Sequence, residues 1–256
     1  MAQQQKPILK RLERAARGAF GNDVSTPWAR ALTWFHFQVF DHAFLRGLWT
    51  NFDTVADGVY RSNHPGPGRL KRYKAMGVRS VLNLRGERGQ APWILEEEAC
   101  RALGLNLYVA KIYARKAARR DELVRLIDTM RVIEKPFVMH CKSGADRAGF
   151  AAVLYAHVID GQPLAEARRH LHWSYAHLSA TRTGIVDHVL DMYEARAARS
   201  PISLEDWLRT EYTKRDVAVS FAKLRGKTPP PLRPQTKPRT PLGPIAPVVR
   251  APDRGP

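Results

Sequence analysis

From Val59 to about Arg199, short apolar runs alternate with longer stretches in which apolar residues recur every three to four positions. The short runs are typical of buried strands and cover residues 78–84, 105–112 and 136–140. The longer stretches predict helices over residues 67–76, 92–103, 121–133, 147–159, 163–172 and 181–198. Strands separated by helices in this order predict an α/β fold, with a central, mostly parallel sheet of four to five strands flanked by helices.

Composition divides the 256 residues into four parts. Residues 1–50 are a basic and aromatic helical extension, and residues 51–200 carry the α/β pattern. Residues 201–226 predict two further short helices. Residues 227–256 contain ten prolines and six Lys or Arg against one Asp, a composition that cannot bury enough apolar surface to offset the entropy of ordering. We therefore expect a disordered basic tail.

Two interpretations of the N-terminal extension stay open. Apolar residues between Ile8 and Ala19 recur at helical spacing, and the first twenty residues carry five basic side chains, which predicts a short basic amphipathic helix. An aromatic-rich segment then runs from Trp28 to Trp49 and predicts a helix that begins at Pro27. This second helix either packs onto the α/β domain or lies on a membrane surface, with the preceding basic residues on lipid head groups.

The charge balance points to an anionic partner. With 42 Lys and Arg against 24 Asp and Glu, the net charge is +18, which should attract phosphorylated substrates, nucleic acid or anionic lipid. Much of the charge lies in the termini and no known nucleic-acid motif is present, so nucleic acid is disfavoured as a partner. Two cysteines make no disulfide framework or metal cluster and fit a reducing compartment. Without a signal peptide or a long apolar run, we expect a cytoplasmic protein, with peripheral contact to an anionic membrane left open.

The candidate chemistry lies in residues 137–149. Cys141 directly follows an apolar strand, and a helix begins at Arg147, six residues later. A strand, a tight loop and a helix start together form a phosphate site, because the loop N–H groups and the helix N-terminus face the anion. The same field favours the thiolate form of Cys141. Arg147 can meet two phosphate oxygens with its planar fork, and Gly144 allows the tight turn.

The pattern His140-Cys141-x-x-Gly144-x-x-Arg147 resembles the signature of the protein tyrosine and dual-specificity phosphatase superfamily. Residues 58–62 and 77–85 look like the opening strands of the compact atypical dual-specificity phosphatases of bacteria, fungi and plants. The resemblance covers residues 51–198 and implies phosphomonoester hydrolysis without a metal or other cofactor, through a phosphocysteine on Cys141. It assigns Arg147 and the loop residues Lys142, Ser143, Gly144 and Ala145 to phosphate binding, and His140 to support of the loop.

Two positions depart from the family pattern. Relatives place Ser or Thr directly after the arginine, where this chain has Ala148; Ser143 is the candidate substitute. The loop of residues 112–120, where relatives carry the general acid, has no acidic residue before Asp121, which we expect to cap its helix. Asp146 is the favoured acid, since some lipid phosphatases of the superfamily carry Asp at this place. The alternatives are that Asp146 only fixes the loop, or that an acidic leaving group makes an acid unnecessary.

The basic residues near the loop bear on the substrate. Arg115, with Lys116, Arg119 and Arg120, replaces the acid of relatives, and Arg85 and Arg88 follow another strand. Such a site favours a multiply phosphorylated or membrane-bound substrate: a phosphoprotein, an inositol phosphate or an anionic phospholipid. A phosphate-binding adaptor without turnover is the competing function, and a rhodanese is disfavoured by the spacing between Cys141 and Arg147. Oligomeric state stays open.

Overall fold

The computed structural model describes residues 21–252, apart from residues 87, 230 and 232–241. Five strands form one sheet: β1 (Asp53–Ala56), β2 (Val59–Asn63), β3 (Ser80–Asn83), β4 (Asn106–Val109) and β5 (Phe137–Cys141). Their order is β1-β2-β5-β3-β4, with β1 antiparallel to β2 and the remaining pairs parallel. The predicted α/β fold with a mostly parallel sheet is confirmed.

The helices follow the predicted order closely. They are α2 (Pro27–Val39), α3 (Pro67–Ala75), α4 (Ala91–Leu103), α5 (Arg120–Val132), α6 (Asp146–Leu154), α7 (Leu164–Ala167), α8 (Ile185–Ala197), α9 (Leu204–Thr210) and α10 (Lys214–Leu224). A π-helical turn, Tyr155–Ile159, extends α6. Short 3₁₀ turns cover Ala43–Gly47, Arg168–His170, Trp173–Tyr175 and Arg182–Gly184.

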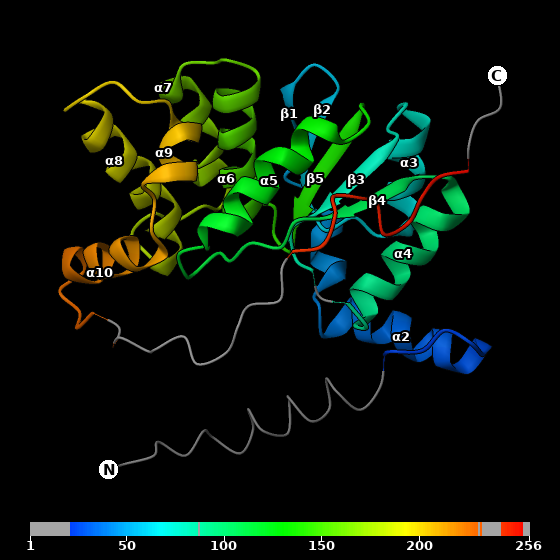
Figure 1. Ribbon diagram of the computed structural model, residues 1–256. Helices are drawn as coiled ribbons and strands as arrows, with labels where there is room; N and C mark the ends of the chain where they lie inside the picture. Colours follow the sequence, from blue (N-terminus) through cyan, green and yellow to red (C-terminus); the bar gives the residue numbers. More distant parts are fainter. Residues whose placement is uncertain (1–20, 87, 230, 232–241, 253–256) are drawn as a thin grey trace, which may run out of the picture.

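Different helices cover the two faces of the sheet (Figure 1). In β5, Phe137 and Met139 belong to one buried cluster, and Val138 between them belongs to the other. This alternation is what a strand imposes on successive side chains. The first cluster includes residues of α5, α6 and α8, and the second includes residues of α3 and α4.

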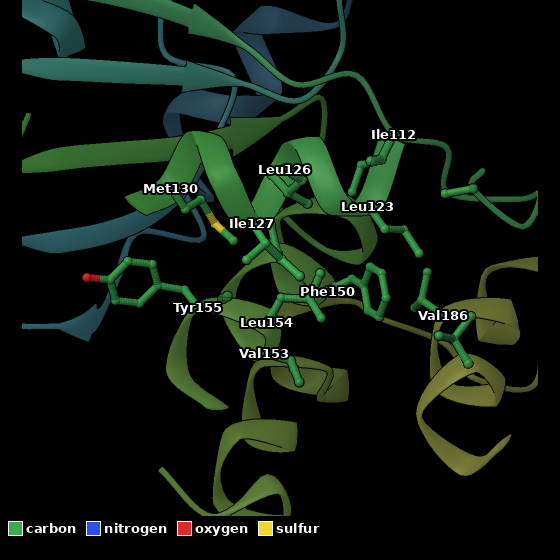
Figure 2. Close-up of a cluster of buried hydrophobic side chains, with 14 of the residues drawn as sticks. Ile112, Leu123, Leu126, Ile127, Met130, Phe150, Val153, Leu154, Tyr155 and Val186 are labelled. Carbon is green, nitrogen blue, oxygen red and sulfur yellow. The ribbon is translucent and has the colours of Figure 1, made fainter. Parts of the chain in front are cut away.

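The larger cluster fixes the helix that follows the candidate site. Leu126 and Ile127 of α5 lie against Phe150 and Leu154 of α6, with Val186 of α8 at the side (Figure 2). Each such side chain, once buried, contributes about 1.5–3 kcal/mol of transfer free energy. The start of α6 is therefore held in place by the core and not by the loop alone.

The aromatic segment forms two helical pieces, where the sequence predicts one. Thr26 caps α2 through its side-chain oxygen, which accepts a hydrogen bond from Ala29 N at 3.1 Å. The helix ends at Val39, and His42 adopts a left-handed backbone with φ of 57° before the 3₁₀ turn Ala43–Gly47. The basic helix expected over residues 8–19 lies outside the described residues. Within the described ranges, no helix is long and apolar enough to cross a membrane.

Part of the C-terminal segment is ordered along the edge of the sheet, which corrects the predicted disorder for these residues. Val249 pairs with Leu107 of β4: Leu107 N donates to Val249 O at 2.9 Å, and Val248 N donates to Leu107 O at 2.7 Å. Val249 is buried in the cluster on the α3 and α4 face, and Ala251 N donates to the Asn106 side chain. Val248 and Val249 supply the apolar surface for this contact, although the segment as a whole is rich in proline.

Candidate active site

The signature loop, residues 141–147, joins the end of β5 to the start of α6. Cys141 is the last residue of β5 and Asp146 is the first of α6. The Cys141 side chain is buried, and the backbone N–H of Gly144 donates to its sulfur at 3.2 Å. This contact stabilises negative charge on the sulfur and shows that the loop curls back over it.

Every carbonyl of the loop between Cys141 and Asp146 accepts a hydrogen bond from outside the curl. Lys142 O accepts from His64 N at 3.3 Å, and Ser143 O accepts from the Asn51 amide at 2.8 Å. The carbonyls of Gly144 and Ala145 accept from the same guanidinium nitrogen of Arg61. Because C=O and N–H point in opposite directions across a planar trans peptide, the N–H groups of residues 143–146 face inward, where a phosphate would lie.

Arg61 of β2 is the buried support of this arrangement. Its side chain is fully buried and also donates to His170 O, with the Tyr175 ring 3.9 Å from the guanidinium carbon. The Tyr175 hydroxyl donates in turn to Asp53. Burial lowers the pKa of Arg61 to about 10, which still leaves it protonated at neutral pH. A charged side chain of β2 thus fixes the loop from its outer side.

Gly144 is required by geometry. Its φ is +77°, in the left-handed region that side chains disfavour. A Cβ there would lie 2.7 Å from both Asn51 Cβ and Asn63 N. Two independent constraints, conformation and space, therefore exclude a side chain at this position.

Arg147 lies in the first turn of α6, half-buried, and its guanidinium forms no ion pair with the described residues. Ala148 after it is fully buried in the core. The Ser143 side chain is exposed and its oxygen accepts from Ala145 N at 3.4 Å. Arg147 is thus positioned by the helix and available to an incoming anion.

A buried acid organises the cations beside the loop. Asp41 pairs with Arg46 at 2.6 Å, with Arg85 at 2.8 Å and with Lys142 Nζ at 3.2 Å. Burial opposes ionisation of Asp41, but the hydrogen bonds from Arg85 and the charges of the three cations hold its pKa well below the usual range. Among the described residues, one carboxylate against three cations gives a net positive charge at this edge of the site.

Asp146 is held by a histidine bridge. Its Oδ1 lies 2.8 Å from His177 Nδ1, and the other ring nitrogen of His177 lies 2.7 Å from Asp187 Oδ2. Burial alone would lower the pKa of His177, but the hydrogen bonds and charges of the two carboxylates raise it to about 9. At neutral pH the imidazole is therefore protonated and donates to both acids.

His140 faces the opposite side of the sheet from the thiol. Its Nε2 lies 2.5 Å from Glu96 Oε1 on α4, and the His64 ring packs against it with centroids 4.8 Å apart. Asn83 donates to the other oxygen of Glu96. Among the described residues, His64, Glu96 and His140 bring donor atoms within 4.8 Å of one another, close enough to hold a metal ion. In the structure the pairing of His140 with Glu96 links the end of β5 to α4.

Only some of the basic residues in the loop before α5 are exposed to solvent. Arg115 and Lys116 are exposed, whereas Arg119 pairs with Asp121 at 3.0 Å and Arg120 donates to Tyr212 O. The N-cap of α5 is Arg119, so Asp121 belongs to the first turn and does not cap the helix as expected. Within the charge run, Arg115 and Lys116 are the members that reach solvent.

Sequence reasoning missed the residues that hold the loop from outside. Asp41, Asn51, Arg61 and His177 come from four distant segments. Arg61 carried a signal, because it lies in a segment that resembles an opening strand of the phosphatases. The other three carried none, since a single Asp, Asn or His outside a motif is common in any chain.

Comparison with known families decides the class of the site. Residues 50–168 match the tyrosine phosphatase family. This part of the chain, just under half of its length, is similar to that family. It is a cysteine-dependent phosphatase domain, as the signature indicates. The match begins just before β1 and ends after α7, so it includes the whole sheet and the signature loop.

Several solved structures are similar to this chain at low sequence identity. TpbA from P. aeruginosa is 20% identical, with 62% of this chain and 89% of that chain covered and a TM-score of 0.45. The catalytic domain of the PP-IP phosphatase SIW14 from S. cerevisiae, in complex with citrate, is 17% identical, with 58% and 91% covered and a TM-score of 0.44. Tk-PTP in its active form is 20% identical, with 58% and 99% covered and a TM-score of 0.42. No curated protein sequence matches the chain.

Proposed function

We propose that this protein hydrolyses phosphomonoesters through a phosphocysteine on Cys141, as a phosphatase of the protein tyrosine or dual-specificity type. The Cys141 sulfur forms a bond to phosphorus while the bond from phosphorus to the leaving oxygen breaks. Water then attacks phosphorus, the bond between sulfur and phosphorus breaks, and the thiolate and inorganic phosphate are released. The residues of this chain carry both steps, with Arg147 and the loop N–H groups binding the three remaining phosphate oxygens.

The hydrogen bonds that hold the loop carbonyls on the outer side of the loop support this proposal most directly. Donors from His64, Asn51 and Arg61 hold these carbonyls and turn the opposite N–H groups toward the place above Cys141. N–H groups oriented in advance stabilise charge that develops in the transition state without a cost of reorganisation. A loop that served only as a turn would need no buried guanidinium behind it.

The bridge through His177 bears on the role of Asp146. The protonated imidazole donates to Asp146 Oδ1 at 2.8 Å, which holds the carboxyl group in place at the start of α6. From this position Asp146 can serve the second step, where water loses a proton as it attacks phosphorus. We therefore propose Asp146 as the base of hydrolysis, with leaving groups acidic enough to depart as anions, such as aryl or pyrophosphate oxygens.

The charge beside the loop supports a highly anionic substrate. Arg46, Arg85 and Lys142 share one carboxylate, and Arg115 and Lys116 are exposed on the loop before α5. A substrate with several phosphates or one at an anionic surface gains more from this field than a single phosphotyrosine does. Inositol phosphates, anionic phospholipids and phosphoproteins with clustered charge are the substrate classes we propose.

Trapping the intermediate tests the mechanism. Wild type and Asp146→Asn, each mixed with a small aryl phosphate and denatured within one turnover, should carry a phosphoryl group on the Cys141 peptide by mass spectrometry. If Asp146 assists hydrolysis, Asp146→Asn accumulates more of it and shows a burst of one aryl alcohol per protein. Cys141→Ser is the matched control and should carry none. Turnover by wild type with no phosphoryl group on Cys141 in either protein would contradict the proposal.

The competing function is a phosphate-binding adaptor. Ala148 removes the hydroxyl that relatives place after the arginine, and the loop before α5 has no acid. An adaptor would bind a phosphate analogue at the loop with no release of aryl alcohol above the uncatalysed rate. That result would show that the protein is an adaptor and not an enzyme.

A further inference from the structure

We propose that α2 and the following 3₁₀ turn dock the protein on an anionic membrane surface, with the signature loop next to the contact. The inference goes beyond the phosphatase activity and does not require turnover. The docking surface, here called the aromatic face, consists of Trp28, Trp34, Phe35 and Val39 on α2 and Phe44, Leu45 and Leu48 in and after the 3₁₀ turn.

The aromatic face is apolar, whereas the solvent-exposed side of a surface helix is normally polar. Phe35 lies seven residues after Trp28 and Val39 four after Phe35, so the three share one side of α2. That side is exposed: Trp28 retains 73% of its accessible surface and Phe35 51%. The opposite side, which contacts the domain, carries the buried Thr33, His36 and Phe37. An outer side more apolar than the inner one indicates an apolar environment outside.

The 3₁₀ turn extends the aromatic face toward the active site. Leu48 is 89% exposed, and Phe44 and Leu45 are more than half exposed. The next residue, Trp49, donates through its indole to Asn51, whose amide holds Ser143 O in the signature loop. The exposed apolar residues and the phosphate-binding loop thus share a continuous edge. In Figure 1, α2 lies at the bottom of the molecule beside the lower end of α4.

Charge and residue type select a membrane over a protein partner. Between Pro27 and Trp49 the chain has one acidic residue, Asp41, and this carboxylate is buried among cations. The twenty residues before the described part contain Lys6, Lys10, Arg11, Arg14 and Arg17 against Glu13. Trp and Phe are favoured at the boundary between lipid head groups and acyl chains. Each basic residue near an anionic surface adds to the attraction.

Binding to vesicles tests the proposal with the full chain. Vesicles of phosphatidylcholine with about one third phosphatidylglycerol should bind the protein in a flotation assay, and pure phosphatidylcholine should bind it far more weakly at low salt. Trp28→Ser/Leu48→Ser should weaken binding to the anionic vesicles about tenfold or more, since two apolar side chains no longer insert. Turnover of a small aryl phosphate should not change, because neither side chain contacts the signature loop.

A second double variant controls for the loss of exposed apolar surface elsewhere on the protein. Val132→Ser/Leu224→Ser removes two side chains that are 59% and 71% exposed on α5 and α10, away from the aromatic face. It should bind the anionic vesicles as wild type does. Equal binding by wild type and Trp28→Ser/Leu48→Ser, or equal loss in the control pair, would overturn the proposal.

Two other occupants of the aromatic face give distinct outcomes. A dimer at micromolar concentration by sedimentation, which Trp28→Ser/Leu48→Ser converts to monomer, would assign the face to a second copy and contradict membrane docking. The third candidate occupant is the segment of residues 1–20, for a hollow of about 540 Å³ between α2 and α4 that is lined by Ala31, Trp34 and Leu95 among others. In that case deletion of residues 1–20 would strengthen vesicle binding. Under the proposal the deletion weakens it.

Discussion

At the scale of single residues, the site depends on groups that hold the signature loop from its outer side. Arg61 and Asn51 hold carbonyls on the outer side of the signature loop, and Gly144 lets the chain turn between them. The motif around Cys141 could be found from sequence because its spacing is fixed by the loop itself. Asn51 could not, because its contact with Ser143 joins residues 92 positions apart.

Gly144→Ala tests whether the space behind the loop matters as well as its backbone angle. Gly161 has the same φ of +77° but open space around its Cα, so Gly161→Ala carries the strain without the clash. We expect Gly161→Ala to lose about 1 kcal/mol of stability and no activity. Gly144→Ala should lose kcat on a small aryl phosphate by about a hundredfold or more, because the loop N–H groups are displaced. Similar activity in the two variants would show that the packing against Asn51 and Asn63 is unimportant.

The bridge of His177 between Asp146 and Asp187 makes a prediction about pH and stability. Since folding raises the pKa of His177 from 6.5 to about 9, its contribution is complete below pH 6.5 and is lost as pH rises through about 9. His177→Gln should therefore be less stable than wild type at pH 6.5, and the difference should shrink toward pH 9. Chemical unfolding across this range measures it. His172→Gln, at an exposed histidine that contacts Ser174, serves as control, and a difference that grows with pH would refute the bridge.

At the scale of elements, the periodicity of apolar residues predicted the helices inside the domain but did not predict the structure at either end. The helices from α3 to α10 follow from the repeat of apolar residues and from proline and glycine at their boundaries. The break at His42 could not be predicted, because the apolar pattern continues through it. The segment around Val249 could not be predicted either, since its order comes from the free edge of β4.

Val249→Asp tests the contact of the C-terminal segment with β4. A buried valine contributes about 2 kcal/mol, and an unpaired carboxylate in its place adds a further cost. We expect the midpoint of thermal unfolding to fall by about 4–8 °C. Activity on an aryl phosphate at low temperature should stay unchanged, because β3 separates β4 from β5 and the signature loop. Leu242→Asp, at a half-exposed position of the same segment, should change neither quantity.

At the scale of the whole molecule, the sequence identified the class of fold and chemistry, and the structure supplied the electrostatics. The net charge of +18 predicted an anionic partner without saying where it binds. In the structure, Asp41 gathers Arg46, Arg85 and Lys142 at one edge of the loop, and the aromatic face adjoins that edge. These juxtapositions depend on how distant segments pack, which no local pattern encodes.

The measurement closest to the central claim is hydrolysis of a small aryl phosphate from about pH 5 to about pH 8 in the presence of EDTA. Three proteins suffice: wild type, Cys141→Ser and Cys100→Ala, the last at the buried cysteine of α4. We expect turnover by wild type and Cys100→Ala at similar rates, and none above the uncatalysed rate by Cys141→Ser. Turnover by Cys141→Ser at the wild-type rate would contradict the cysteine-dependent mechanism.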